Sequence, residues 1–155
     1  MGCHRWLQAK GVKQWERLYP ETRFRADLAQ GCVLCVEEAR RVVATVTVYE
    51  QAPHYYPDWI RSDPLPCWYI CRLAVSRDAR GQSIGESVLG KLERRAAAAG
   101  VKALRLDAVR ANPFWQRYYE AQGFKAVSEY ELHGTSAVVM EKSGEDARVG
   151  GDAAC

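Results

Sequence analysis

The sequence has no long hydrophobic run, and no charge of one sign dominates it. No stretch of about 18 apolar residues occurs, which argues against a membrane-spanning helix. The opening residues carry charges without an apolar segment behind them, so we expect no secretory signal and a cytoplasmic protein. The formal net charge is +3, from 22 basic and 19 acidic residues. This balance disfavours a nucleic-acid-binding domain, which would need clustered lysines and arginines.

Cysteine is sparse for a protein stabilised by disulfide bonds. The six cysteines have no accompanying secretory signal, so we expect reduced thiols. Cys32 with Cys35, and Cys67 with Cys71, have a spacing that invites a zinc interpretation. Both pairs fall inside expected strands, and Cys32 and Cys35, three apart, point to opposite faces, so we expect no metal site.

The chain has 155 residues, of which 48% are hydrophobic, as in one ordinary globular domain. We expect a single domain over residues 1–142 and a disordered tail over 143–155, which has almost no large apolar side chains. Periodicity and glycine stops predict helices over 6–10, 21–30, 83–99 and 113–122. Alternation predicts strands over 32–36, 41–49, 67–75, 102–109, 124–132 and 135–141, and the proline-rich residues 51–66 should form a loop. This order indicates an α/β fold with a mixed sheet.

A short basic, glycine-containing turn joins one expected strand directly to an amphipathic helix. It runs from Val75 through Arg80, Gly81 and Ser83 to Gly85. The first N–H groups of a helix lack internal partners and lie at the positive end of its dipole, so they suit a phosphate or pyrophosphate. The glycine spacing fits neither the nucleotide P-loop nor Gly-x-Gly-x-x-Gly. A turn that uses glycine only for its permissive backbone remains an alternative.

A second motif follows one strand later, with Asn112, a helix containing Tyr119, and then Gly123-Phe124. Together the two motifs resemble the GNAT superfamily of acetyl-CoA-dependent N-acyltransferases. That family has a strand, Arg/Gln-x-x-Gly-x-Gly/Ala and a helix, followed by Asn, a helix, Tyr and Gly-Phe. The resemblance is strong over residues 67–125 and looser over 6–142. It departs at Ser83, where the family usually has glycine.

The resemblance implies a GNAT-like mixed, mostly antiparallel central sheet flanked by helices, with the family's first strand missing. The sheet edge beside residues 32–36 would then be open, which would allow a homodimer. The strands that end at Val75 and begin near Lys102 would splay apart around the pantetheine arm of acetyl-CoA. A main-chain amide of the splayed strand would polarise the thioester carbonyl. The implied cofactor-binding residues are Leu73, Val75, Arg80, Gly81, Gln82, Ser83, Ile84, Gly85 and Asn112.

Two residues of the second motif have structural alternatives. Asn112 before Pro113 is also what helix N-capping predicts, and both roles stay open. Tyr119 matches the family's tyrosine, whose phenol would protonate the departing coenzyme A thiolate, but it could instead be a core aromatic. Helix geometry places Tyr118 with Phe114 on the neighbouring face, so we assign Tyr118 to packing and Tyr119 to chemistry.

The sequence does not identify the base that deprotonates the acceptor. Many relatives carry an acidic residue near position 71, whereas this strand has Cys71-Arg72-Leu73. An amine that arrives partly neutral would need no dedicated base. The remaining candidates, each of which could instead be solvated or structural, are Glu50, His54, Asp58 and Asp107.

The acceptor is equally open. Tyr56 or Trp59 in the 51–66 loop could face a cationic amine with Asp58 pairing to it, or these aromatics could cover the core. The predicted function is acetyl transfer from acetyl-CoA to a primary amine of a small molecule or peptide. A coenzyme A-binding sensor or interaction module without turnover is the alternative, since an acidic residue is missing near position 71.

Overall fold

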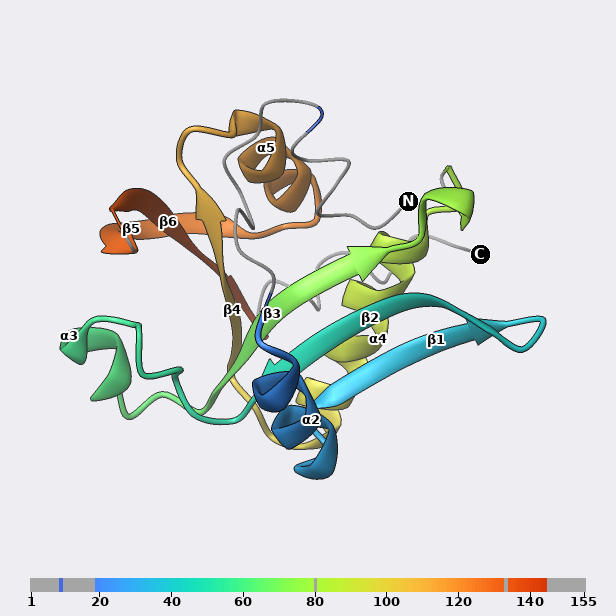
Figure 1. Ribbon diagram of the computed structural model, residues 1–155. Coiled ribbons are helices and arrows are strands. Elements are labelled where there is room, and N and C mark those ends of the chain that lie inside the picture. The colour runs from blue at the N-terminus through green and yellow to red at the C-terminus, as the bar shows by residue number, and fades with distance from the viewer. Residues whose placement is uncertain (1–8, 10–18, 80, 133, 145–155) are drawn as a thin grey trace, which may run out of the picture. The chain divides into compact units, whose positions relative to one another are not determined.

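Helices and strands alternate along the chain largely as the sequence predicts. The computed structural model describes residues 9, 19–79, 81–132 and 134–144 (Figure 1). The expected helix at 6–10, apart from Ala9, and the tail from residue 145 lie outside the described residues. The helical elements are α2 (Glu21–Ala29), α3 (Asp58–Arg61), the 3₁₀ turn η1 (Arg77–Ala79), α4 (Ile84–Ala98) and α5 (Pro113–Ala121). The strands are β1 (Val33–Glu38), β2 (Arg41–Tyr49), β3 (Cys67–Val75), β4 (Ala103–Val109), β5 (Lys125–Leu132) and β6 (Thr135–Ser143).

The six strands form a mixed, mostly antiparallel sheet. Their order is β1-β2-β3-β4-β6-β5. The registers of β1 with β2, β4 with β6 and β5 with β6 are antiparallel, whereas β3 runs parallel to β4. The expected sheet type is therefore confirmed, and β1 lies at an edge. In the described part of the chain, no helix is long and apolar enough to cross a bilayer.

The chain divides into two compact units, and β3 and α4 each pass from one unit to the other. The first unit comprises residues 1–48 and 71–88, and the second comprises residues 49–70 and 89–155. In the first unit, β1 and β2 form the expected hairpin around Ala39 and Arg40, which both have positive φ. Positive φ at both central residues is typical of two-residue hairpin turns, because its twist matches that of the flanking strands.

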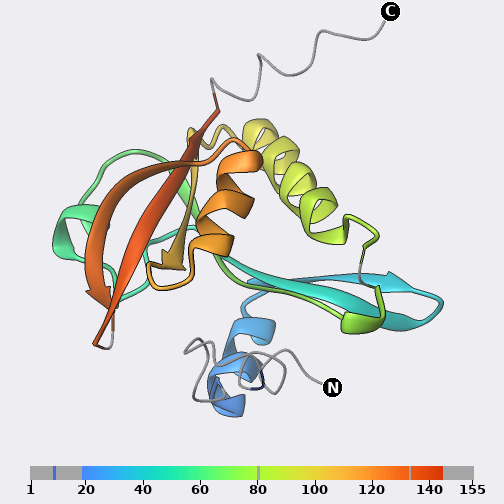
Figure 2. The ribbon, with the colours of Figure 1, turned by 90° about the horizontal axis from the view of Figure 1, so that it is seen from above.

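The second unit is built on β4, β6 and β5. Its α5 packs against these strands, whereas α3 and its flanking loop lie on their opposite side (Figure 2). Leu104, Leu106 and Ala108 of β4 are buried, as are Leu89 and Leu92 of α4. Residues two apart in a strand, and residues three apart in a helix, lie on the same face. Each element therefore presents one apolar face to the core.

The segment 51–66 contains one helical turn that the sequence reading excluded. Pro57 precedes the turn, where a missing N–H costs no hydrogen bond, and α3 follows over Asp58–Arg61. Ile60, only 1% exposed, anchors the turn in the core. The prolines therefore limit this helix to one turn rather than preventing it.

Candidate active site

The glycine-containing turn lies in the first unit, immediately before α4. Gly81 and Ser83 both have left-handed backbone, with φ of +81° and +50°. The Ser87 amide donates to the Ser83 carbonyl at 3.0 Å, so the amides of residues 84–86 precede the first helical hydrogen bond. These amides lie at the positive end of a 15-residue helix and can bind an anion. Of the turn residues predicted to bind the cofactor, Arg80 lies outside the described residues.

Ser83 has a left-handed backbone, which glycine adopts more readily than serine. A left-handed backbone costs a non-glycine residue about 1–2 kcal/mol. The neighbouring Gln82 is exposed like Ser83, while Ile84 is buried and anchors the start of the helix. Serine therefore accommodates the left-handed backbone of this turn, and it adds a hydroxyl at an exposed position.

The second half of β3, also in the first unit, contains Leu73 and Val75, which are both half-buried. The preceding residue, Arg72, has a φ of +52°, which interrupts the extended backbone of the strand. Ile70 and Cys71 are consecutively buried, so the usual in-and-out alternation fails at this point. No local pattern in the sequence predicts this irregularity.

An ion pair holds the Arg72 side chain. Its Nη2 lies 2.8 Å from Asp27 Oδ2, and its Nε donates to Thr47 Oγ1 at 3.3 Å. The guanidinium carbon lies 4.0 Å from the centroid of the Tyr19 ring, and the Tyr19 hydroxyl donates to Asp27 at 3.1 Å. We call Tyr19, Asp27, Thr47 and Arg72 the Arg72 clamp. It connects α2 and β2 to the irregular point of β3.

The second unit contains Asn112 and Tyr119. The Asn112 side chain makes no capping hydrogen bond, although its carbonyl accepts from the Trp115 amide at 3.2 Å. Capping by the Asn112 amide is therefore wrong, and the amide group is not committed to the start of the helix. The Tyr119 ring lies 5.9 Å from that of buried Phe124 and 6.2 Å from that of Trp115.

Burial does not distinguish the expected packing face of α5 from its expected chemical face. No residue of α5 is buried, and Phe114, on the Tyr118 face, is 57% exposed. Tyr118 stacks on Phe114 with ring centroids 6.4 Å apart. Tyr118 and Tyr119 are both half-buried, so burial is the same for the two candidate side chains.

The candidate bases have different surroundings. Glu50, His54 and Asp58 are exposed, and Asp58 pairs with Arg61 at 2.5 Å. Asp107 is partly buried, and its Oδ1 accepts a hydrogen bond from the Tyr56 hydroxyl at 2.9 Å. Burial raises the pKa of Asp107 above its usual value, and the Tyr56 hydrogen bond opposes this only in part.

The aromatic residues of the 51–66 loop also take different roles. Tyr56 is 2% exposed and packs in the core, whereas Trp59 is 54% exposed. Tyr56 therefore follows the core-covering alternative, yet its hydroxyl reaches Asp107.

A buried arginine connects this loop to the sheet. Arg105 pairs with Asp63 at 2.5 Å and with Glu141 at 2.7 Å, and its Nη1 lies 3.5 Å from the Tyr69 hydroxyl. Burial alone would lower the pKa of Arg105, but the two carboxylates raise it, so the guanidinium stays charged. Two hydrogen bonds lower the pKa of Asp63: the larger effect comes from the Leu65 amide and the smaller from Arg105.

The structure describes four of the six cysteines, Cys32, Cys35, Cys67 and Cys71. None of those in the described residues forms a disulfide bond, and no group of three His, Cys, Asp or Glu in that part of the chain could hold a metal. Burial raises the pKa of the Cys67 thiol to about 11, so Cys67 stays protonated at neutral pH.

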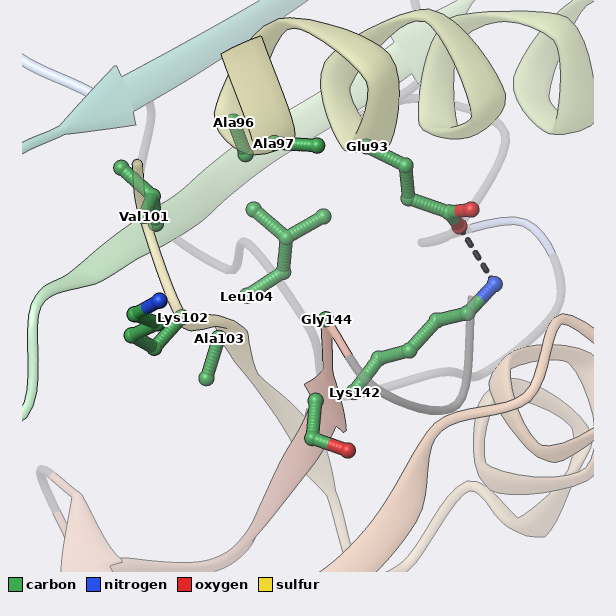
Figure 3. A pocket seen from close by; sticks show the side chains of 10 residues that line it. Glu93, Ala96, Ala97, Val101, Lys102, Ala103, Leu104, Lys142 and Gly144 are labelled. Carbon is green, nitrogen blue, oxygen red and sulfur yellow. Dashed lines mark hydrogen bonds and ion pairs between the residues drawn. The ribbon is translucent and has the colours of Figure 1, made fainter. Parts of the chain in front are cut away.

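A small cavity lies in the second unit between α4 and the strands β4 and β6 (Figure 3). Its volume is about 30 Å³, and the ion pair between Lys142 and Glu93, at 2.6 Å, lies on its wall. A ligand pocket usually has roughly 300–1,000 Å³, so this cavity does not accommodate a coenzyme.

Comparisons with known proteins agree with the two motifs. The chain matches the Acetyltransferase (GNAT) family over residues 1–124. It is similar to a GNAT family acetyltransferase from Streptococcus agalactiae, with 21% identity over 90% of this chain and 83% of that one, and a TM-score of 0.74. A GNAT family acetyltransferase from Listeria monocytogenes gives 22% identity, 90% and 81% coverage, and a TM-score of 0.72.

A GNAT family acetyltransferase from Elizabethkingia anophelis, solved with acetyl-CoA bound, is 14% identical over 80% of this chain and 83% of that one, with a TM-score of 0.60. Curated protein sequences contain no significant match. At these identities the structural likenesses establish the fold, and the family match covers both motifs. The chain belongs to the GNAT acetyltransferase family.

Proposed function

We propose that this protein transfers an acetyl group from acetyl-CoA to a primary amine of a small molecule or peptide. The observation that carries the proposal is the left-handed turn at Gly81 and Ser83 directly before α4, in a chain of this family. The turn presents main-chain amides where a pyrophosphate would accept hydrogen bonds. The acetyl-CoA bound to the Elizabethkingia anophelis relative supports the same carrier here.

The proposed roles follow from the chemistry of each group. The backbone and Ser83 hydroxyl of the turn, together with Arg80, would hold the pyrophosphate, and the backbone of Leu73 and Val75 would bind the pantetheine arm. The Asn112 amide, which makes no capping hydrogen bond, would bind the same arm. Acetyl-CoA supplies an activated thioester when bound. The Tyr119 hydroxyl would give its proton to the leaving sulfur.

Calorimetry with acetyl-CoA and a thiol-release assay over a panel of amines test the proposal. We expect heat of binding and thiol release with at least one primary amine. Tyr119→Phe should lower kcat about 100-fold or more, the usual contribution of a proton donor, while acetyl-CoA affinity stays within about two-fold. Tyr118→Phe is the matched control and should keep wild-type kcat. Equal turnover of both variants would remove Tyr119 from the mechanism, and no heat with acetyl-CoA would refute carrier binding.

A coenzyme A-binding sensor without turnover is the second candidate. The observation in its favour is that this chain has no acidic residue near position 71, where many relatives carry one. The residue next to that position is Arg72, which forms an ion pair with Asp27. Heat with acetyl-CoA but no thiol release across the panel would support this candidate instead.

A further inference from the structure

Asp107 lies in β4 just beyond the end of that strand's register with β3. The parallel register pairs Cys67–Tyr69 with Ala103–Arg105, whereas Asp107 pairs with Val139 of β6 on its other side. Residues two apart in a strand share a face, so Asp107 lies on the same face as Arg105. On the β3 side, the register of β4 therefore ends at Arg105, before Asp107 is reached.

Tyr56 fixes the position of the Asp107 carboxylate. Its hydroxyl donates to Oδ1 at 2.9 Å, and its ring is packed with centroids 5.5 Å from both Tyr69 and Tyr130. Because Tyr56 is 2% exposed, the ring has little freedom to move. Asp107 is partly exposed as a residue, while its carboxylate is desolvated.

The other acidic groups in this region are unsuited to the same task. Asp63 and Glu141 both pair with the buried Arg105. Asp58 pairs with Arg61 and is 92% exposed. The Asp107 carboxylate accepts its hydrogen bond from a neutral hydroxyl, and no cation in the described part of the chain pairs with it. This contrast singles out Asp107 among the carboxylates of the loop and its sheet face.

We infer that Asp107 is the general base of the proposed acetyl transfer, and that Tyr56 is the residue that positions it. The inference rests on the proposed function. Asp107 accepts a proton from the acceptor ammonium, and the nitrogen lone pair then forms the C–N bond to the acetyl carbon. The C–S bond breaks, and the sulfur takes the Tyr119 proton. The second nitrogen proton restores Tyr119, and Asp107 releases its proton to water.

The surroundings of Asp107 favour this role. Desolvation raises its pKa, which brings the carboxylate nearer to the pH at which a base works best. Arg105 carries the one positive charge in its ion-pair network and is balanced by two carboxylates. The titratable and charged groups described around this face come from the loop and from β2 to β6: Tyr49, Tyr55, Tyr56, Asp63, Cys67, Tyr69, Arg105, Tyr130 and Glu141.

The test is the pH profile of kcat for full-length wild type, Asp107→Asn, Tyr56→Phe and the control Asp58→Asn. All four use one amine, so the amine's own titration contributes equally to each profile. In wild type, kcat should fall at low pH as the Asp107 carboxylate becomes protonated, and we call this fall the acidic limb of the profile. Asp107→Asn should lower kcat by about 10²- to 10⁴-fold and should lack this limb. Tyr56→Phe removes a hydrogen bond to the carboxylate, so that limb should move to higher pH by on the order of one unit. Asp58→Asn should leave the limb unchanged.

The outcomes separate this inference from the proposed function. Wild-type turnover combined with an unchanged profile in Asp107→Asn would overturn the inference and leave the proposed function standing. If Tyr56→Phe lowers kcat but leaves the acidic limb at its wild-type pH, the positioning role of Tyr56 would be refuted. Absence of wild-type turnover with every amine would overturn both. Asp107→Asn should fold, because it removes a carboxylate whose ionised form is disfavoured by desolvation. At pH 8 its melting temperature should therefore be no lower than that of wild type.

Discussion

The Arg72 clamp gives a sharp prediction for the change Asp27→Asn. Asparagine keeps the shape of the side chain and an oxygen acceptor but removes the negative charge facing the guanidinium. Arg72 would then keep its positive charge with Thr47 and the Tyr19 ring as remaining contacts of the clamp. Because Arg72 has a left-handed backbone, which costs about 1–2 kcal/mol, the clamp also offsets local strain in β3.

The expected loss of stability follows from the burial of the pair. The side chains of Arg72 and Asp27 are 21% and 11% exposed. Breaking a fully buried pair costs about 3–5 kcal/mol, and an exposed pair contributes about 0.2–1 kcal/mol. A largely buried pair whose partner is replaced by a neutral isostere should lie between these limits, at about 2 kcal/mol. For a chain of this length, about 3 °C of melting temperature corresponds to each kcal/mol, so we expect a decrease of about 6 °C.

Thermal unfolding followed by circular dichroism measures this decrease, and Asp78→Asn is the matched control. Asp78 pairs with Arg41 at 3.5 Å in the same unit, but these side chains are 78% and 75% exposed. Its replacement should lower the melting temperature by no more than about 1 °C. Equal shifts for Asp27→Asn and Asp78→Asn would show that the buried clamp contributes no more than a surface pair, and the reasoning would fail.

Two further changes test the turn and the thiols. Ser83→Gly should relieve the left-handed strain while adding chain entropy to the unfolded state, for a net gain of about 0.5–1 kcal/mol in the free energy of unfolding by urea titration. A loss of stability would mean that the serine is not strained. In maleimide labelling at pH 8, exposed Cys35 should react in the native protein, whereas Cys67, with a pKa of about 11 and 5% exposed, should react only after unfolding. Equal native labelling rates would contradict the burial of Cys67.

Local patterns in the sequence predicted most of the fold. The helix expected over 83–99 is observed at Ile84–Ala98, because its apolar spacing and the following glycine are local signals. Gly123, which follows α5, has a φ of +86°, and a glycine after a helix is a local signal for such a left-handed cap. The one-turn helix α3 was missed, because a single turn is too short to show periodicity.

The contacts that distinguish the candidate residues were not predictable in the same way. Asp27 and Arg72 are 45 residues apart in sequence, and Tyr56 and Asp107 are 51 apart. No local pattern brings such residues together, because tertiary packing decides which carboxylate is buried. Asp107 was therefore one of four equivalent candidates in the sequence, and its partial burial and Tyr56 contact separated it from the other three.

This difference has a chemical basis. The proposed carrier site depends on main-chain amides, whose geometry is determined by a few consecutive residues around Ser83. The proposed acceptor chemistry depends on side chains of Tyr56 and Asp107, which only the folded sheet brings together. Changes at Ser83 should therefore act on acetyl-CoA affinity, and changes at Asp107 should act on kcat. A loss of carrier binding raises KM for acetyl-CoA and leaves kcat unchanged, whereas the loss of a general base lowers kcat. Steady-state kinetics can therefore test the carrier site and the acceptor chemistry separately.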